Sequence, residues 1–197
     1  YVNINAIGSN NGMSWTNAFT DLQVALSSAI YNDEIWVATG TYKATDLNNR
    51  DNSFVMKNAV NLYGGFNGTE TSISQRNLLE NPTNLSGDIG QLGDNKDNTK
   101  KIIKIQNITT EIIIDGFRII SGYDWSESGK GAGIYFYNNS GGKIIINNCI
   151  FYNNASYHSG GALYIYTSNV TFNKCEFLYN TSFNYGGGAL YSANGAN

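Results

Sequence analysis

Apolar residues in this chain occur in many short runs that are separated by glycine, asparagine and serine. The runs are rich in isoleucine, valine, tyrosine and phenylalanine, as in Val60–Tyr63. Runs of this kind, bounded by turn residues, predict short β-strands. Residues 20–29 differ, because apolar residues recur there at helical spacing behind Thr20–Gln23, which has the Thr-x-x-Gln form of a capping box. We therefore expect an all-β protein with one short amphipathic helix.

The C-terminal third of the chain repeats itself. Gly160–Tyr164 and Gly187–Tyr191 share the sequence GGALY at a spacing of 27 residues, and Gly131–Tyr135 is a weaker copy. A second phrase, Cys-x-Phe-x-x-Asn, occurs at Cys149–Asn154 and returns 26 residues later at Cys175–Asn180. Self-similarity at a period of 20–50 residues is typical of stacked repeats, whose units cannot bury their apolar faces alone. Three short strands per repeat predict a parallel β-helix, a solenoid whose coils stack at roughly 4.8 Å.

Equivalent residues of neighbouring coils form columns in such a stack. We expect a column of inward aromatic rings, a column of turn asparagines and a column of thiols: Phe151 and Phe177, Asn154 and Asn180, Cys149 and Cys175. A turn asparagine can bond to the backbone and to the same amide in the next coil. The paired thiols invite a disulfide, but their side chains leave stacked positions in the same direction, which favours buried free cysteines. Both alternatives stay open at this point.

The expected helix suits the beginning of a solenoid. The first coil exposes apolar interior and unpaired strand edges, which a terminal unit has to cover. We expect residues 1–32, a strand followed by the helix, to form this cap, with an ordinary surface helix as the alternative. Residues 33–130 should form irregular coils with loop excursions, and residues 131–197 the regular repeats of the same domain.

These motifs resemble those of two groups of bacterial proteins. GGALY alternating with Phe-x-x-Asn is similar to the repeats of the chlamydial polymorphic outer-membrane proteins. The first half resembles secreted β-helix proteins of Bacteroidetes-type bacteria, at Asp33–Tyr42, Gly64–Glu70, Gln75–Arg76 and Leu85–Ile89. The resemblance implies a right-handed parallel β-helix that is secreted or displayed on a cell surface. It implies adhesion or extracellular structure as the function, with no shared catalytic residues.

Composition agrees with an extracellular, non-nucleic-acid-binding β protein. Only 14% of the 197 residues are charged and the net charge is −3, so neither a nucleic-acid footprint nor a polybasic membrane patch is expected. The hydrophobic share of 41% excludes a disordered chain. No run approaches the roughly 18 apolar residues of a membrane span. The expected partners are a host or neighbouring cell surface, or carbohydrate.

One segment carries candidate metal ligands. Asp88, Asp94 and Asp97 lie in the most oxygen-rich stretch of the chain. Clustered carboxylates and amides, together with backbone carbonyls, supply the oxygen ligands that calcium takes. The spacing fits neither an EF-hand nor a calcium nonapeptide repeat, which favours a solvated loop, so calcium is the one cofactor to consider and none is otherwise expected.

A second segment combines carboxylates with aromatic rings. Its members are Tyr123, Asp124, Trp125 and Glu127. Such a cluster could hold a sugar ring against an aromatic face. An exposed loop with one buried aromatic anchor explains the same residues, so both interpretations are kept.

A polysaccharide-cleaving lyase or hydrolase is the alternative from another class of function, because parallel β-helices host such enzymes. Paired catalytic acids on adjacent coils would recur near the repeat period. Asp115 instead shares its column with Asn147 and Asn173, and the lone histidine, His158, has no acidic neighbour in sequence. We therefore expect a protein that is not an enzyme.

The sequence ends just after a GGALY phrase, at Ser192–Asn197, without a capping segment. Either further repeats and an anchor have been removed, or this end stacks on a neighbouring molecule. The helix expected at the other end would block growth there, which favours a fragment. Self-association through the C-terminal coil, giving a filament or surface-layer subunit, is the alternative to adhesion.

Overall fold

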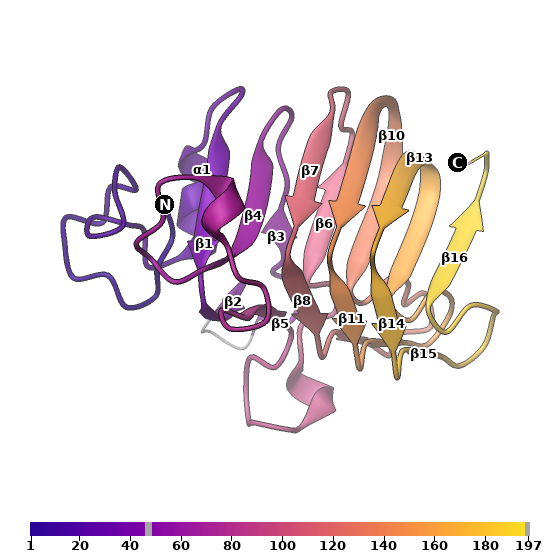
Figure 1. The fold of residues 1–197 in the computed structure, drawn as a ribbon. Helices are drawn as coiled ribbons and strands as arrows, with labels where there is room; N and C mark the ends of the chain where they lie inside the picture. Colours follow the sequence, from indigo (N-terminus) through magenta and orange to yellow (C-terminus); the bar gives the residue numbers. More distant parts are fainter. Residues whose placement is uncertain (46–48, 196–197) are drawn as a thin grey trace.

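The computed structural model describes residues 1–45 and 49–195. The described chain forms three β-sheets in which every pairing between strands is parallel. Figure 1 shows the strands following one another along the molecule, from the indigo N-terminal part to the yellow C-terminal part. The helices of the described residues are α1 (Leu22–Ser28) and two short 3-10 helices, η1 (Ile73–Gln75) and η2 (Asn95–Asp97).

Each sheet takes its strands in turn from successive repeats of the chain. The largest sheet contains, in order, β1 (Glu34–Ala38), β4 (Asn61–Phe66), β7 (Ile112–Asp115), β10 (Ile134–Asn147), β13 (Leu163–Asn173) and β16 (Leu190–Ala193), and β3 (Phe54–Val55) joins it through β6 (Ile103–Gln106). The second contains β2 (Gly40–Lys43), β5 (Thr83–Ser86), β8 (Phe117–Ile120), β11 (Ile150–Tyr152) and β14 (Glu176–Leu178). The third contains β9 (Tyr123–Asp124), β12 (Ala155–Ser156) and β15 (Thr181–Ser182). This all-β, parallel arrangement is consistent with the parallel β-helix that the repeats predict.

The strand register aligns the sequence repeats with one another. Tyr164 of the first GGALY phrase pairs with Tyr191 of the second, and Phe151 pairs with Phe177. The two GGALY phrases and the two Cys-x-Phe-x-x-Asn phrases therefore occupy equivalent positions, as predicted. Gly160 shows why the phrase begins with glycine: its φ is +61°, and an added Cβ would overlap the carbonyl oxygen of Leu163.

One hydrophobic core lies between the sheets. Its fully buried rings belong to a single cluster and come from strands spread along the chain: Phe54, Phe117, Phe136 and Phe151. The pleat of each strand sends alternate side chains inward. Ile144 and Ile146 of β10 are accordingly fully buried, whereas Ile145 between them is partly exposed.

The predicted N-terminal helix is present, but its cap is a different residue from the one expected. Asp21, not Thr20, is the N-cap, because its Oδ1 accepts hydrogen bonds from the backbone N–H groups of Gln23 (2.6 Å) and Val24 (3.1 Å). With Asp21 as the N-cap, the third helical residue is Val24, which has no side-chain acceptor, so no capping box forms here. The helix packs against β1 and β3 and contributes Leu22, Ala25 and Leu26 to the core.

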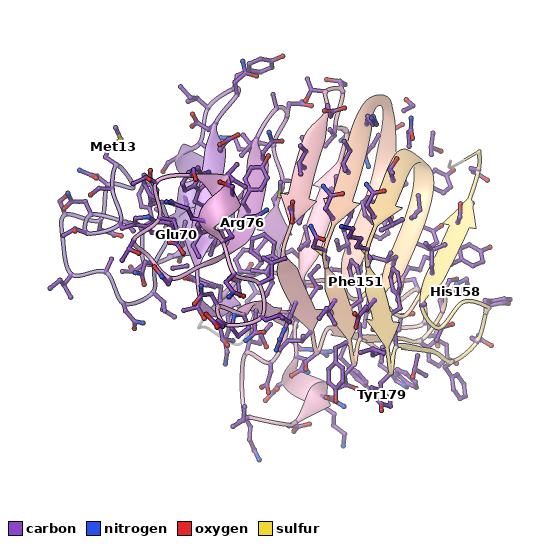
Figure 2. The ribbon with its side chains drawn as sticks, viewed as in Figure 1. Met13, Glu70, Arg76, Phe151, His158 and Tyr179 are labelled. Atoms are coloured by element: carbon purple, nitrogen blue, oxygen red, sulfur yellow. The ribbon has the colours of Figure 1, made fainter. Side chains whose placement is uncertain are left out.

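The loop between β4 and β5 is fixed by two charged side chains. Glu70 is 6% exposed, and its carboxylate accepts backbone N–H bonds from residues 67–69 at 2.7–3.0 Å. Burial raises the pKa of Glu70, but these bonds lower it more, so the pKa lies below its usual value. Arg76 forms an ion pair with Asp115 (3.3 Å) and lies over the ring of Phe66. Both side chains lie in the loop drawn in front of the N-terminal strands (Figure 2).

Candidate functional site

Four aromatic side chains meet beside the third sheet. We call Tyr123, Trp125, Tyr157 and Phe183 the aromatic cluster. The rings of Tyr123 and Trp125 stack with centroids 5.3 Å apart and planes at 6°, and Tyr157 meets Trp125 edge-on at 5.8 Å. Phe183 lies 5.6 Å from Trp125 and 5.4 Å from Tyr157. Trp125 is 41% exposed and Phe183 66% exposed, so the cluster presents apolar surface to solvent.

The repeat architecture creates this cluster. Trp125, Tyr157 and Phe183 each follow the first residue of β9, β12 and β15 by two positions, and these first residues are paired with one another. The three rings therefore occupy one column of the stack. Sequence reasoning identified Trp125 and missed the other two. The signal that could have found them is the spacing of 26 residues between Tyr157 and Phe183, which equals the repeat.

The sequence suggested that Asp124 offers its carboxylate to a ligand, but the structure places this side chain in the interior. The residue is 1% exposed, its Oδ2 lies 2.6 Å from Nζ of Lys101, and its Oδ1 accepts from the hydroxyl of Ser126 at 2.7 Å. Alternation along β9 explains why Asp124 is buried. Tyr123 and Trp125 point outward, so the side chain between them points inward. Glu127 lies exposed in the loop that follows. Asp124 and Lys101 thus support the cluster from within.

Arg50 and the loop that follows β5 anchor the base of the cluster. The guanidinium of Arg50 donates to the carbonyl oxygens of Tyr123 (2.8 Å) and Asn98 (2.7 Å). The backbone N–H of Tyr123 donates to the carbonyl of Thr99 at 2.9 Å. Segments distant in sequence are therefore joined at the first residue of the aromatic cluster.

The three aspartates proposed as calcium ligands all lie in that loop, which projects below the stack in Figure 1 and carries η2. Asp94 caps η2 through a bond from the N–H of Lys96 (2.9 Å). Asp88 and Asp97 accept instead from backbone N–H groups of residues 91–93. In the part of the chain that the structure describes, no three His, Cys, Asp or Glu side chains form a group that could hold a metal ion.

The predicted columns of the regular repeats are present. The rings of Phe151 and Phe177 stack at 4.8 Å with planes at 6°. Asn154 donates from Nδ2 to Oδ1 of Asn180 (3.0 Å), and Asn180 donates from Nδ2 to the carbonyl of Phe151 (2.8 Å). Each turn asparagine thus bonds both to the backbone and to the amide of its neighbour, which is the ladder expected from the sequence.

Cys149 and Cys175 are both free thiols. Each donates to a backbone carbonyl, Cys149 to Ile114 and Cys175 to Ile146. Burial raises the pKa of both thiols, and Cys149 is completely buried. Of the two alternatives, the structure has the free thiols: Cys149 is a small buried apolar side chain, as expected, whereas Cys175 is only partly buried.

A ladder of stacked tyrosines runs across β10, β13 and β16. Tyr135 stacks on Tyr164 at 5.5 Å, and Tyr164 stacks on Tyr191 at 5.7 Å. Burial raises the pKa of Tyr135 and Tyr164, so these rings stay neutral at physiological pH. The ammonium of Lys101 lies 5.5 Å from the ring of Tyr135 and also pairs with Asp124, which connects the ladder to the aromatic cluster.

His158 and Asp115, the ionisable residues considered for catalysis, have separate partners. His158 bonds through Nδ1 to the hydroxyl of the adjacent Ser159, and partial burial, followed by the charge of Lys130, lowers its pKa. Asp115 is paired with Arg76 and lies opposite Asn147 in the sheet, as predicted from the repeat.

Comparison with known proteins gives one match. Residues 148–166 match the model of the Chlamydia polymorphic membrane protein repeat. This segment contains one Cys-x-Phe-x-x-Asn phrase and the first GGALY phrase. The chain is therefore similar, over this segment, to polymorphic-membrane-protein repeats, which is consistent with a protein of the bacterial surface. The resemblance of the first half to Bacteroidetes-type proteins stays a prediction.

Searches of characterised proteins and of solved structures give no significant match. Among the described residues, no helix has the length and apolar character needed to cross a membrane.

Proposed function

We propose that this chain is part of a right-handed parallel β-helix, secreted or displayed on a bacterial surface, that binds carbohydrate through its aromatic cluster without catalysis. Its role would be adhesion to a host or neighbouring cell. The observation that carries the proposal is the exposed column of Trp125, Tyr157 and Phe183, stacked beside Tyr123.

Physical chemistry favours a ligand for this cluster. Exposed and contiguous apolar surface is uncommon on soluble monomers and marks binding sites. A pyranose ring offers a C–H face that buries apolar area against an aromatic ring, and its hydroxyl groups remain free to bond at the edges. Tyr123 and Tyr157, whose rings both contact Trp125, carry hydroxyl groups, and the Lys101–Asp124 pair keeps the strand β9 in position.

The repeat match supports the setting of the proposed function. It covers residues 148–166, which include Tyr157 of the aromatic cluster. A repeat that resembles those of polymorphic membrane proteins favours a surface role over an intracellular one. Rigid repeats with exposed side chains at regular spacing also suit a surface that binds by shape.

The test is a screen of the chain on an oligosaccharide array, followed by calorimetric titration of each sugar that binds. Trp125→Ala should weaken binding at least tenfold, because a stacked ring of this size contributes most of the contact area. Tyr31→Ala is the control: this ring is 66% exposed, as is that of Phe183, but it lies outside the aromatic cluster. Its affinity should stay within twofold of the unmodified chain.

Three results would count against the proposal. Absence of binding to any sugar would refute the carbohydrate ligand, and an equal loss in Tyr31→Ala would show that the effect is not specific to the aromatic cluster. New reducing ends released from a bound polysaccharide would favour the lyase or hydrolase alternative. Light scattering and electron microscopy of the same sample over a range of concentrations test the other alternative, because long uniform fibres would indicate a structural subunit.

A further inference from the structure

The loop from Asp88 to Thr99 contains a concentration of buried oxygen atoms that have no hydrogen-bond partner within the described residues. They are Oδ1 of Asp88, Oδ1 of Asp97, Oδ1 of Asn98 and Oγ1 of Thr99. Asn98 and Thr99 are each only 1% exposed. Native proteins leave few buried polar groups unpaired, and an unrecorded water or ion is a common explanation for those that remain. Four such atoms in one loop therefore point to a shared ligand.

The loop is a small closed ring that brings its two ends together. The N–H of Thr99 donates to the carbonyl of Gly87 at 2.7 Å, which closes the loop. A closed path of twelve residues with 3.8 Å between successive Cα atoms is roughly 15 Å across. The closure places Thr99 beside Gly87, so Asp88 on one side and Asp97, Asn98 and Thr99 on the other come together at the neck of the loop.

The carboxylates of Asp88 and Asp97, at opposite ends of the loop, accept hydrogen bonds from the same turn, residues 91–93. Oδ2 of Asp88 accepts from the N–H of Gly93 (3.1 Å), and Oδ2 of Asp97 accepts from the N–H of Gln91 (2.7 Å). Each carboxylate is therefore oriented by one oxygen, and its other oxygen is the buried, unpaired one. An arrangement that fixes one carboxylate oxygen and leaves the other free is suited to a metal ligand.

The negative charge of the loop is not compensated by a neighbouring cation. Neither Asp88 nor Asp97 forms a salt bridge with any described residue. Three nearby cations have other partners: Lys100 pairs with Asp51, Lys101 pairs with Asp124, and Arg50 donates to backbone carbonyls. Lys96 lies in the loop itself, but its ammonium forms no salt bridge with Asp88 or Asp97. Burial of carboxylate oxygens without a paired counter-charge is unfavourable, so a bound cation would stabilise this loop.

We propose that this loop binds one calcium ion through the four unpaired oxygens, with backbone carbonyls and water completing the coordination. Ligands that are oxygen only select a hard cation, and calcium accepts six to eight of them in flexible geometry, whereas magnesium keeps several waters and takes one or two carboxylates. Asp94, a member of the set suggested by the sequence, is left out because its carboxylate caps η2. The proposal does not depend on the carbohydrate site.

Calcium in this loop would also act on the neighbouring surface. Thr99, one of the proposed ligands, accepts through its carbonyl from the N–H of Tyr123 at 2.9 Å. A bound ion would therefore hold the base of the aromatic cluster in place.

The experiment is calorimetric titration of the full chain, freed of metal with EDTA, by CaCl2 and separately by MgCl2. We expect one calcium site with a Kd on the order of 10⁻⁴–10⁻³ M, as in other extracellular modules, and much weaker magnesium binding. Asp88→Asn and Asp97→Asn should each weaken calcium binding at least tenfold. Asp94→Asn, which makes the same charge change in the same loop, should stay within twofold.

An uncharged variant distinguishes the loss of a calcium ligand from a change in net charge or a failure to fold. Thr99→Val keeps the shape and the net charge but removes the hydroxyl, so calcium binding should weaken several-fold. Without calcium its melting temperature should be unchanged or higher, because an unpaired buried hydroxyl is gone. Circular dichroism checks that each variant is folded.

Three outcomes would overturn the proposal. One is no heat and no rise in melting temperature at about 10 mM CaCl2, which would mean that only water fills the loop. Another is an equal loss in Asp94→Asn and Asp97→Asn, which would reduce the effect to general attraction by an acidic loop. The last is equally tight binding of magnesium, which would refute the assignment to calcium.

Discussion

Asn154 is the residue whose replacement tests the stacked arrangement of repeats most directly. Its fully buried side chain makes three hydrogen bonds to the repeats on either side: Oδ1 accepts from the N–H of Gly122 (2.9 Å), and Nδ2 donates to the carbonyl of Ile119 (2.9 Å) and to Oδ1 of Asn180 (3.0 Å). Asn154→Ala removes all three at once. Buried groups of the neighbouring repeats then lose these partners.

The expected cost follows from those contacts. A hydrogen bond contributes about 1 kcal/mol net, and a buried group left without its partner costs about 1–3 kcal/mol. Because Gly122 and Ile119 are both buried, we expect Asn154→Ala to lower the free energy of unfolding by about 3–4 kcal/mol. Asn173→Ala is the matched control, since its Nδ2 also bonds to the amide of an adjacent repeat, Oδ1 of Asn147 in the preceding one at 2.8 Å, but the pair is exposed. That variant should lose about 0.5 kcal/mol.

Urea unfolding at 25 °C, followed by far-ultraviolet circular dichroism and analysed by linear extrapolation, measures both losses. The slope of the transition should be unchanged in the two variants, because neither alters the surface exposed on unfolding. A loss below about 1 kcal/mol for Asn154→Ala would contradict the argument that its bonds hold neighbouring repeats together. Equal losses in the two variants would contradict the role assigned to burial.

Three other changes test the remaining parts of the fold. Phe151→Ala should cost about 3–5 kcal/mol in urea unfolding, because the ring is fully buried and stacked on its neighbour, and a smaller loss would mean that the core is loosely packed. Glu70→Gln should destabilise the chain at pH 7 by about 1–2 kcal/mol. The pKa of Glu70 is lowered in the folded state, so its contribution to stability is present above the unfolded pKa of about 4.3 and is lost as the pH falls through the folded pKa. The melting temperatures of the variant and the unmodified chain should therefore converge in acid and differ at neutral pH. Ellman's reagent should modify Cys175 well before Cys149 in the native chain, since Cys149 is fully buried with a raised pKa, and equal native rates would show that this interior opens readily.

The regular repeats were predictable because their pattern is written twice in the sequence. The spacing of the GGALY and Cys-x-Phe-x-x-Asn phrases determines which residues lie opposite one another in a parallel stack, so the pairing of Phe151 with Phe177 follows from counting. The asparagine ladder follows from the same count and from the bonding capacity of the amide group. Strand type, turn type and register all agree in this region, which is the condition for a reliable prediction.

The first half of the chain was less predictable because long-range contacts determine its loops. Glu70 and Arg76 belong to the segments that carried the resemblance, but their spacing does not reveal that one closes a turn and the other reaches Asp115, 39 residues away. The helix cap is a smaller example. Both Thr20 and Asp21 are good N-cap residues, and only the position of the helix on β1 and β3 decides between them.

Only part of the aromatic cluster could be predicted, again because long-range contacts create it. Tyr123 and Trp125 stood out in sequence as aromatic neighbours, but their two partners come from later repeats and become neighbours only when the strands stack. Asp124 was misplaced because its burial depends on Lys101, which precedes it by 23 residues and supplies the counter-charge. Local composition suggests which residue types are present, whereas tertiary contacts decide which side of the sheet each one occupies.

The columns of this fold differ in what they require of their residues, and this difference supports a binding role for the aromatic cluster. An inward column such as Phe151 and Phe177 must be apolar, because the core depends on it. An outward column has no such requirement. Phe183 is 66% exposed and therefore adds little to the core, yet it continues the aromatic column of Trp125 and Tyr157. Core packing does not account for a ring at that position, and this column is therefore the feature on which the proposed carbohydrate binding rests.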